Sequence, residues 1–124
     1  MIAKNISGKF GEAYAAKYLE GNGYKIIRRN YKTKIAEIDI VAMDGDVLCF
    51  VEVKTRKNKE FGMGLEAVDK NKRNKMILGA RSYLATFNPD CDIRFDVVEV
   101  YGEMLSTGFA VSEINLIKNA FYAD

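Results

Sequence analysis

Two short segments in the middle of the chain carry the residues best suited to chemistry. Asp39 stands thirteen residues before a Glu-x-Lys triplet, Glu52 to Lys54, and an Asp-Gly turn signal begins at Asp44 between them. Such a turn between two β-like runs predicts a hairpin. Removing two carboxylates and an ammonium from water on one face of a hairpin costs free energy, so such a cluster indicates a functional site. This set of groups suits a divalent cation that is held against a phosphodiester.

Strand periodicity predicts which side chains of the first segment, residues 35–43, share a face. Successive side chains of a strand point to opposite sides. Ile38 and Ile40 therefore fall on one face, and Glu37 and Asp39 fall on the other. In the second segment the same rule puts both charged residues of the triplet on one face.

Pairing of the two strands would bring the charged residues together. A two-residue loop at 44–45 places Asp39 opposite Phe50. The same register places Glu37 opposite Glu52. Carboxylates that meet in this way repel one another, and a hard cation such as Mg²⁺ would relieve the repulsion. The alternative is a solvated hairpin edge on which glutamate and lysine side chains only pair with each other.

Composition restricts the remaining chemistry. The chain has 124 residues, 48% of them hydrophobic and 29% charged, which fits one globular domain over residues 1–124. It has no histidine, so histidine-based zinc sites and Ser-His or Cys-His nucleophiles are excluded. No segment has the apolar length of a transmembrane helix or a signal peptide. Cys49 and Cys91 lack CxxC spacing, and we expect buried, reduced thiols in a cytoplasmic protein.

Charge is unevenly distributed along the chain. Residues 1–34 carry eight basic and two acidic side chains, whereas residues 35–53 carry five acidic side chains and no basic ones. Residues 54–81 are basic again, with nine Lys or Arg against three acids. A nuclease needs this arrangement, because basic surfaces hold the polyanion and an acidic pocket holds the metal. The alternative for each lysine is a solvated helix surface.

The rest of the chain predicts an α/β sheet with helices packed on it, in the order α-β-β-β-α-β and then a last strand or short helix. The expected elements cover residues 5 or 7 to 20, 24–31, 35–43, 47–54, 65 or 69 to 87, and 93–101, with a turn at 101–103. On the first helix Glu12 shares a side with Ala16 and Leu19, so it would point toward the sheet unless it is an ordinary exposed acid. The second helix would face the core with Ile77, Ala80, Leu84 and Phe87.

Basic residues predict a nucleic-acid-binding surface beside the hairpin. The polar segment after the hairpin contains Arg56, Lys57 and Lys59. The early turns of the second helix contain Lys72 and Arg73. We expect these side chains to follow a phosphodiester backbone.

Motifs spread over nearly the whole chain resemble the bacterial YraN-like family. They comprise Gly8-x-x-Gly11-Glu12, Arg29-Asn30-Tyr31, Glu37-Ile38-Asp39, Phe50-Val51-Glu52-Val53-Lys54-Thr55-Arg56 and Arg94-Phe95-Asp96-Val97-Val98. That family is similar to archaeal Holliday-junction resolvases and to the PD-(D/E)XK nuclease superfamily, whose core has the order α-β-β-β-α-β. The resemblance implies a single-domain, restriction-endonuclease-like fold and a metal-dependent nuclease that acts on structured nucleic acid.

The resemblance also implies a role for each matching residue. Asp39 and Glu52 would bind Mg²⁺ or Mn²⁺, and the Val53 carbonyl and Glu12 would be further metal ligands. Lys54 would match the motif lysine, which orients water and neutralises the phosphate. DNA is favoured over RNA as the partner, and the dimeric resolvases suggest a homodimer.

Two positions depart from these patterns. Ile38 stands where the superfamily motif has proline, and Ala36 stands where the YraN-like pattern has glycine. Because fold and motif do not fix function, two further functions stay open beside the nuclease. One is a nucleic-acid-binding or partner-docking module that keeps the site residues without catalysis. The other is a metal-free adaptor whose hairpin charges pair only with each other.

Overall fold

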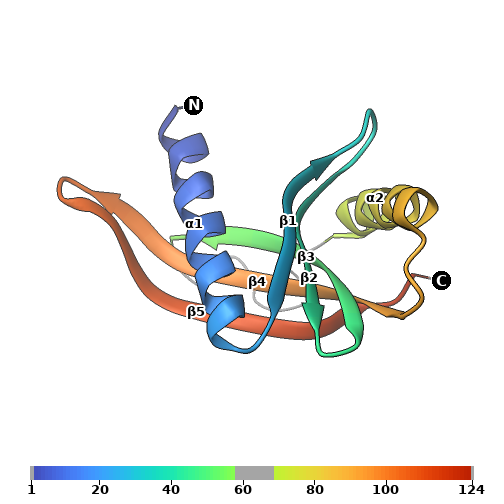
Figure 1. Ribbon diagram of the computed structural model, residues 1–124. Coiled ribbons are helices and arrows are strands. Elements are labelled where there is room, and N and C mark those ends of the chain that lie inside the picture. Colours follow the sequence, from blue (N-terminus) through green and yellow to red (C-terminus); the bar gives the residue numbers. More distant parts are fainter. Residues whose placement is uncertain (1, 58–68, 124) are drawn as a thin grey trace.

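A five-stranded mixed sheet and two helices make up the described part of the chain (Figure 1). The computed structural model describes residues 2–57 and 69–123, so Lys59 and the earlier of the two predicted starts of the second helix, residue 65, lie outside it. The elements are α1 (Ile2–Gly21), β1 (Lys25–Lys32), β2 (Glu37–Asp44), β3 (Val47–Arg56), α2 (Lys70–Phe87), β4 (Asp92–Leu105) and β5 (Gly108–Phe121). The predicted α/β class is confirmed.

The strands lie in the sheet in their order along the chain. β3 and β4 are parallel and the other neighbours are antiparallel. A parallel pair needs a crossover, which α2 provides. The turn predicted at 101–103 is wrong, because β4 continues to Leu105 and the chain turns just before Gly108. Gly102 instead marks a register shift within the β4–β5 ladder.

The turn of the central hairpin lies one residue later than predicted. Gly45 and Asp46 form the two-residue loop, and Gly45 has a φ of +61°, which favours glycine. The register therefore places Val41, rather than Asp39, opposite Phe50. A one-residue shift of the loop moves the pairing by two residues, so it changes each partner but not the face on which the side chain lies.

β2 and β3 separate at one end of their shared ladder. Their pairing ends at Ile40 and Val51. Beyond this point β2 stays beside β1, whereas β3 stays beside β4 as far as Arg56. Figure 1 shows the β1–β2 pair rising away from β3 and β4. Asp39 and Glu52 are the first residues beyond the end of the ladder.

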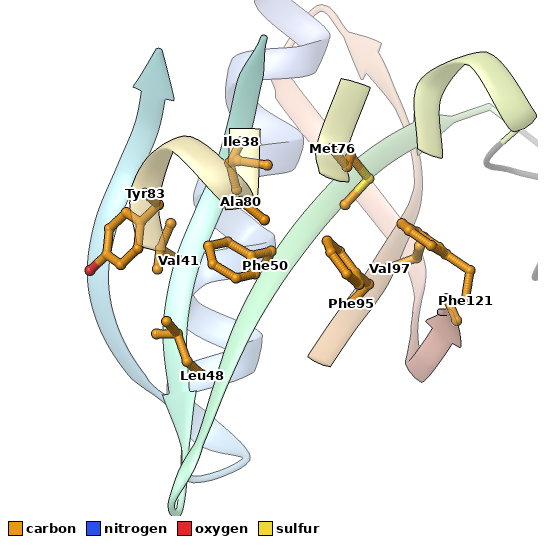
Figure 2. Packing of buried hydrophobic residues seen from close by; sticks show 11 residues of the cluster. Ile38, Val41, Leu48, Phe50, Met76, Ala80, Tyr83, Phe95, Val97 and Phe121 are labelled. Atoms are coloured by element: carbon orange, nitrogen blue, oxygen red, sulfur yellow. The ribbon is translucent and has the colours of Figure 1, made fainter. Parts of the chain in front are cut away.

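Each helix packs on its own cluster of buried side chains. The α1 cluster includes Leu19, Ile40 and Val51. The α2 cluster includes Phe50 and Met76, and Figure 2 shows it lying between α2 and the sheet.

The prediction that Ile38 and Ile40 of β2 lie on the same face is wrong. Ile38 belongs to the α2 cluster, whereas Ile40 belongs to the α1 cluster. Strict alternation would put both on one face. The alternation fails at Asp39, where β2 leaves β3 and no longer follows its pleat.

The core face of α2 is centred one residue before the predicted stripe. Its buried residues are Met76, Gly79, Ala80 and Tyr83. Ala80 is confirmed as a core residue. The prediction that Phe87 faces the core is wrong, because its side chain is 42% exposed. The guanidinium of Arg28 lies over the Phe87 ring, 4.4 Å from its centroid.

Neither helix of the described residues is long and apolar enough to cross a membrane. Cys49 is buried and Cys91 is half-buried, and both are free thiols. Burial raises the pKa of the Cys49 thiol to about 12, so this side chain stays protonated and unreactive at neutral pH.

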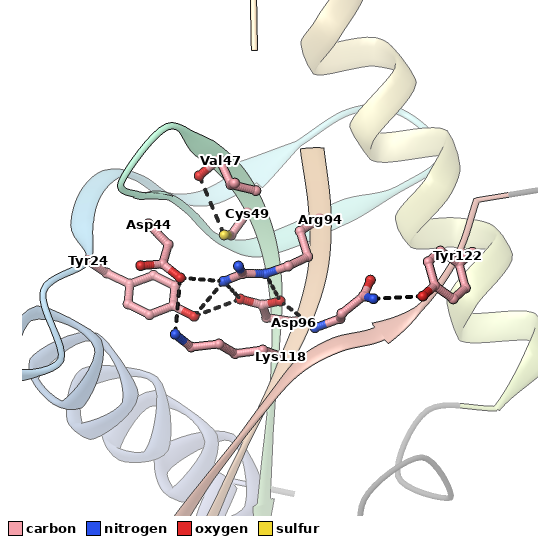
Figure 3. A network of polar contacts seen from close by, with 9 residues as sticks. Tyr24, Asp44, Val47, Cys49, Arg94, Asp96, Lys118 and Tyr122 are labelled. Atoms are coloured by element: carbon pink, nitrogen blue, oxygen red, sulfur yellow. Dashed lines mark hydrogen bonds and ion pairs between the residues drawn. The ribbon is translucent and has the colours of Figure 1, made fainter. Parts of the chain in front are cut away.

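A polar network ties the ends of several elements together at the fully buried Asp96 (Figure 3). Arg94 donates hydrogen bonds of 2.8 Å to both Asp96 carboxylate oxygens. The Tyr24 hydroxyl, at 2.8 Å, and the Asn119 backbone N–H, at 2.9 Å, donate to the same carboxylate. Arg94 also bonds Asp44 at 2.7 Å, and this contact holds the pKa of Asp44 below its ordinary value. Four well-directed donors compensate the cost of burying the Asp96 charge.

Asp96→Asn should therefore lower the free energy of unfolding by about 3 kcal/mol or more. The amide nitrogen of the new asparagine would face hydrogen-bond donors where a carboxylate oxygen now accepts, and Arg94 would lose its buried anionic partner. Urea unfolding of parent and variant measures this. Asp92→Asn, at an exposed position of the same strand, is the control and should change the unfolding free energy little. Equal losses in both variants would contradict a stabilising role for the Asp96 network.

Candidate functional site

Asp39 and Glu52 lie beside each other where β2 and β3 separate. Asp39 Oδ2 accepts a hydrogen bond of 2.8 Å from the Val53 backbone N–H. This side chain thus replaces the backbone acceptor that a continued ladder would supply. Burial and, next, the negative charge of Glu52 raise the pKa of Asp39 to about 7. The pair therefore behaves as two carboxylates that resist ionising together.

Glu52 is held between two lysines. Its side chain is only 5% exposed, with Lys54 Nζ 3.3 Å from Oε2 and Lys72 Nζ 3.4 Å from Oε1. Oε1 is buried and accepts no hydrogen bond from the described residues, so its contact with Lys72 is an ion pair only. A buried carboxylate oxygen without a hydrogen bond keeps lone pairs that a cation could use.

Glu12 reaches the same site from α1. It lines a cavity of about 310 Å³ together with Asp39, Glu52 and Lys54; Ser7, Gly8, Val53 and Thr55 complete the wall. Burial raises the pKa of Glu12, and the charge of Asp39 adds to this effect. A hydrogen bond from Asn30 opposes the rise.

The close approach of α1 to β3 places Glu12. A Cβ at the neighbouring Gly11 would overlap Thr55 Oγ1, so only glycine allows the helix to lie this near the strand. At Gly8, by contrast, a Cβ would meet nothing within 4 Å.

The structure separates the other predicted residues. Glu37 does not meet Glu52, so that predicted pairing is wrong, because β2 is already paired with β1 there. Glu37 instead lies 3.8 Å from Lys32 Nζ. Arg56 and Lys57 line a neighbouring hollow of about 260 Å³, which shares Ser7 and Thr55 with the first cavity.

The two basic residues predicted on α2 differ in position. Arg73 is exposed, whereas Lys72 contacts Glu52 inside the site. Sequence reasoning missed this inward position, because the predicted core stripe of α2 did not include Met76, which stands four residues after Lys72 on the same side of the helix. It also missed Asn30, whose left-handed backbone, with a φ of 54°, gave no sequence signal beyond the residue type.

The site fits a hard divalent cation through two carboxylates. Among the described residues, no three acidic or sulfur side chains are close enough to form a complete metal site. Mg²⁺ does not require one, because it is commonly bound through one or two carboxylates plus water and phosphate oxygens. Asp39 and Glu52 supply two such groups, and the Glu52 oxygen without a hydrogen bond is consistent with this use. A role for the Val53 carbonyl stays a prediction.

Fold and site together define an α/β protein that holds a buried carboxylate pair beside two lysines, at the point where two central strands separate. The chain belongs to the uncharacterised protein family UPF0102, whose family model matches residues 11–100. The predicted YraN-like family is thereby confirmed.

Relatives in this family match the chain along most of its length. A UPF0102 protein of Desulforapulum autotrophicum is 46% identical over 122 residues, which cover 98% of this chain and 97% of that protein. One from Caldanaerobacter subterraneus is 41% identical over 121 residues, covering 97% and 98%. One from Chlorobium limicola is 48% identical over 99 residues, covering 79% and 77%.

Gly8→Ala and Gly11→Ala form a matched pair that tests how α1 is placed. Both changes favour the helix by about 1 kcal/mol. Only Gly11→Ala adds a methyl group against Thr55, so we expect Gly8→Ala to stabilise the protein and Gly11→Ala to destabilise it. Urea unfolding measures both. Stabilisation of similar size in both variants would show that α1 can move away from β3 freely.

The raised pKa of Asp39 predicts a pH dependence of stability in EDTA. A carboxyl whose pKa rises from 3.8 to about 7 on folding binds its proton more tightly in the folded state. Its contribution therefore makes the protein less stable as the pH rises through this range. Asp39→Asn keeps an acceptor for the Val53 N–H and removes the titration. The melting temperature of Asp39→Asn minus that of the parent should therefore be larger at pH 8 than at pH 5. We expect this difference to grow by on the order of 5 °C between the two pH values.

Asp46→Asn, in the exposed hairpin turn, is the control for this titration. Its melting temperature relative to the parent should not change between the two pH values. If Asp39→Asn also follows the parent at both pH values, Asp39 is not the group that titrates.

Proposed function

We propose that this chain is a metal-dependent nuclease that hydrolyses phosphodiester bonds in structured DNA, on a restriction-endonuclease-like fold similar to that of Holliday-junction resolvases. The observation that carries the proposal is the buried Asp39–Glu52 pair with Lys54 beside it, in a cavity that Glu12 also lines. The element order α-β-β-β-α-β, with the pair where β2 and β3 separate, supports the same conclusion.

In this proposal each site residue has a chemical task. Asp39 and Glu52 would hold Mg²⁺ or Mn²⁺ directly, with the Val53 carbonyl as a further ligand and Glu12 acting through a bound water. Such an ion, when bound, supplies a Lewis acid for the phosphate and a water of lowered pKa. Lys54 would orient the attacking water and place positive charge beside the scissile phosphate.

The basic side chains around the cavity would hold the nucleic-acid backbone. Arg56 and Lys57 lie in the hollow next to the site, and Arg73 is exposed on α2. A backbone contact by Lys59, which lies outside the described residues, stays a prediction from the sequence. Such contacts recognise phosphates and not bases, so selectivity would depend on the shape of the DNA. A four-way junction has two equivalent strands, which suits a homodimer, and we place this activity in the cytoplasm.

A second candidate function is nucleic-acid binding or partner docking without cleavage. The observation in its favour is that Glu52 is already neutralised by Lys54 and Lys72. A carboxylate paired in this way can serve a structural purpose without a metal. Binding of nucleic acid would then depend on the surrounding basic residues alone.

Cleavage of a panel of labelled substrates tests the proposal. The panel comprises duplex, single strand, flap and four-way junction, each with Mg²⁺, Mn²⁺ or EDTA. We expect metal-dependent cleavage by the parent, and a loss of at least about 100-fold in Asp39→Asn and in Glu52→Gln, because each change removes a ligand that the reaction needs. Glu20→Gln, at an exposed position of α1, is the control and should cleave like the parent.

Gel shifts on the same substrates distinguish the two functions. Salt-sensitive binding by parent and Asp39→Asn alike, with no cleavage by the parent in either metal, would contradict the nuclease and support the binding module. Absence of both binding and cleavage at low salt would contradict both functions and favour an adaptor.

A further inference from the structure

Lys72 lies on the core-facing side of α2. Among residues 70–75 it is the one half-buried residue, with 30% of its side-chain surface accessible, whereas the others are exposed. It precedes the fully buried Met76 by four residues, so both side chains lie on the same side of the helix. Burying part of the lysine stem restricts its rotamers and costs conformational entropy, so a compensating interaction is expected for the ammonium group.

The beginning of α2 is fixed in place around Lys72. Asp69 caps the helix and accepts a hydrogen bond of 2.8 Å from the Lys72 backbone N–H. Further along, Gly79 packs closely on Ile38 of β2, since a Cβ added at Gly79 would come within 3.0 Å of that side chain. The packing of α2 therefore places the Lys72 ammonium group at a defined position against the sheet.

The ammonium reaches the buried carboxylate oxygen that has no hydrogen bond. Lys72 Nζ lies 3.4 Å from Glu52 Oε1, while Lys54 occupies the other oxygen at 3.3 Å. At this separation the contact is ionic and lacks the strength of a short charge-assisted hydrogen bond. Each carboxylate oxygen of Glu52 thus faces one ammonium group.

We propose that Lys72 is a further residue of the site, which occupies the cation position at Glu52 in the metal-free protein and transfers to a substrate phosphate when a divalent ion is bound. This inference rests on the proposed nuclease function. Lys72 gives up Glu52 because an ammonium and a divalent ion repel each other and compete for the same oxygen. The freed Lys72 ammonium is then available to the negative charge of the phosphodiester.

This exchange couples metal binding to substrate binding. Without substrate, binding of the ion costs the Lys72–Glu52 pair and leaves an excess of positive charge in the cavity. With a phosphodiester present, Lys72 regains a partner, and the negative charge of the phosphate offsets part of that excess. Metal and nucleic acid should therefore strengthen each other's binding, and Lys72 is the residue that links the two.

Isothermal titration with Mn²⁺, without nucleic acid, tests this role by a readout other than activity. Lys72→Met removes the competing ammonium and should tighten Mn²⁺ binding about tenfold. Lys72→Arg keeps a cation and should restore an affinity near that of the parent. Lys75→Met removes the same charge from an exposed position of the same helix and should change the affinity less than about threefold. Thermal melts establish that each variant is folded.

Asp39→Asn separates the two levels of the proposal. Mn²⁺ binding by the parent that is lost in Asp39→Asn supports the metal site itself. If Lys72→Met then binds Mn²⁺ no more tightly than Lys75→Met, the exchange is wrong while the metal site stands. If the parent binds no Mn²⁺, both the exchange and the metal-dependent function are overturned.

Discussion

The separation of β2 from β3 beyond Ile40 and Val51 is the constraint on which the rest of the site depends. A continued ladder would fill this space with backbone hydrogen bonds and leave no room for a cavity. Because the strands part, Asp39 can bond the Val53 N–H with its side chain, and the carboxylate becomes part of the sheet's hydrogen bonding. Side chains from both helices reach this point, because α1 places Glu12 in the cavity beside Asp39 and α2 places Lys72 against Glu52.

Two buried acids of this protein show how differently a carboxylate can be accommodated. The Asp96 carboxylate accepts four directed hydrogen bonds from Arg94, Tyr24 and Asn119. Both of its oxygens are therefore satisfied, as is typical of a structural group. Glu52 is almost as buried, yet its Oε1 has only an ion pair at 3.4 Å. Incomplete satisfaction of a buried charge is costly to stability, and such a cost is expected where a group also serves a ligand.

Much of the fold followed from local patterns. The hairpin and the α-β-β-β-α-β order came from alternation, from helix periodicity and from turn residues, which act between neighbours along the chain. The loop error was local, whereas the other errors arose where distant contacts decide. The loop moved by one residue because Gly45 is needed at the first turn position, and Ile38 changed face because β2 follows β1 there. Phe87 left the core because α2 meets the sheet through Met76, Gly79 and Tyr83.

The sequence by itself determined the chemistry: carboxylates and lysines without histidine, an Asp39 and Glu52–Lys54 motif, and membership of a family. Those properties depend on residue types and short spacings, which are fixed along the chain. Only the tertiary structure decided that Glu12 and Lys72, from helices on opposite faces of the sheet, meet at the same carboxylates. The physical reason is that packing of Gly11 on Thr55 and of Gly79 on Ile38 sets where each helix lies, and no local pattern encodes such contacts.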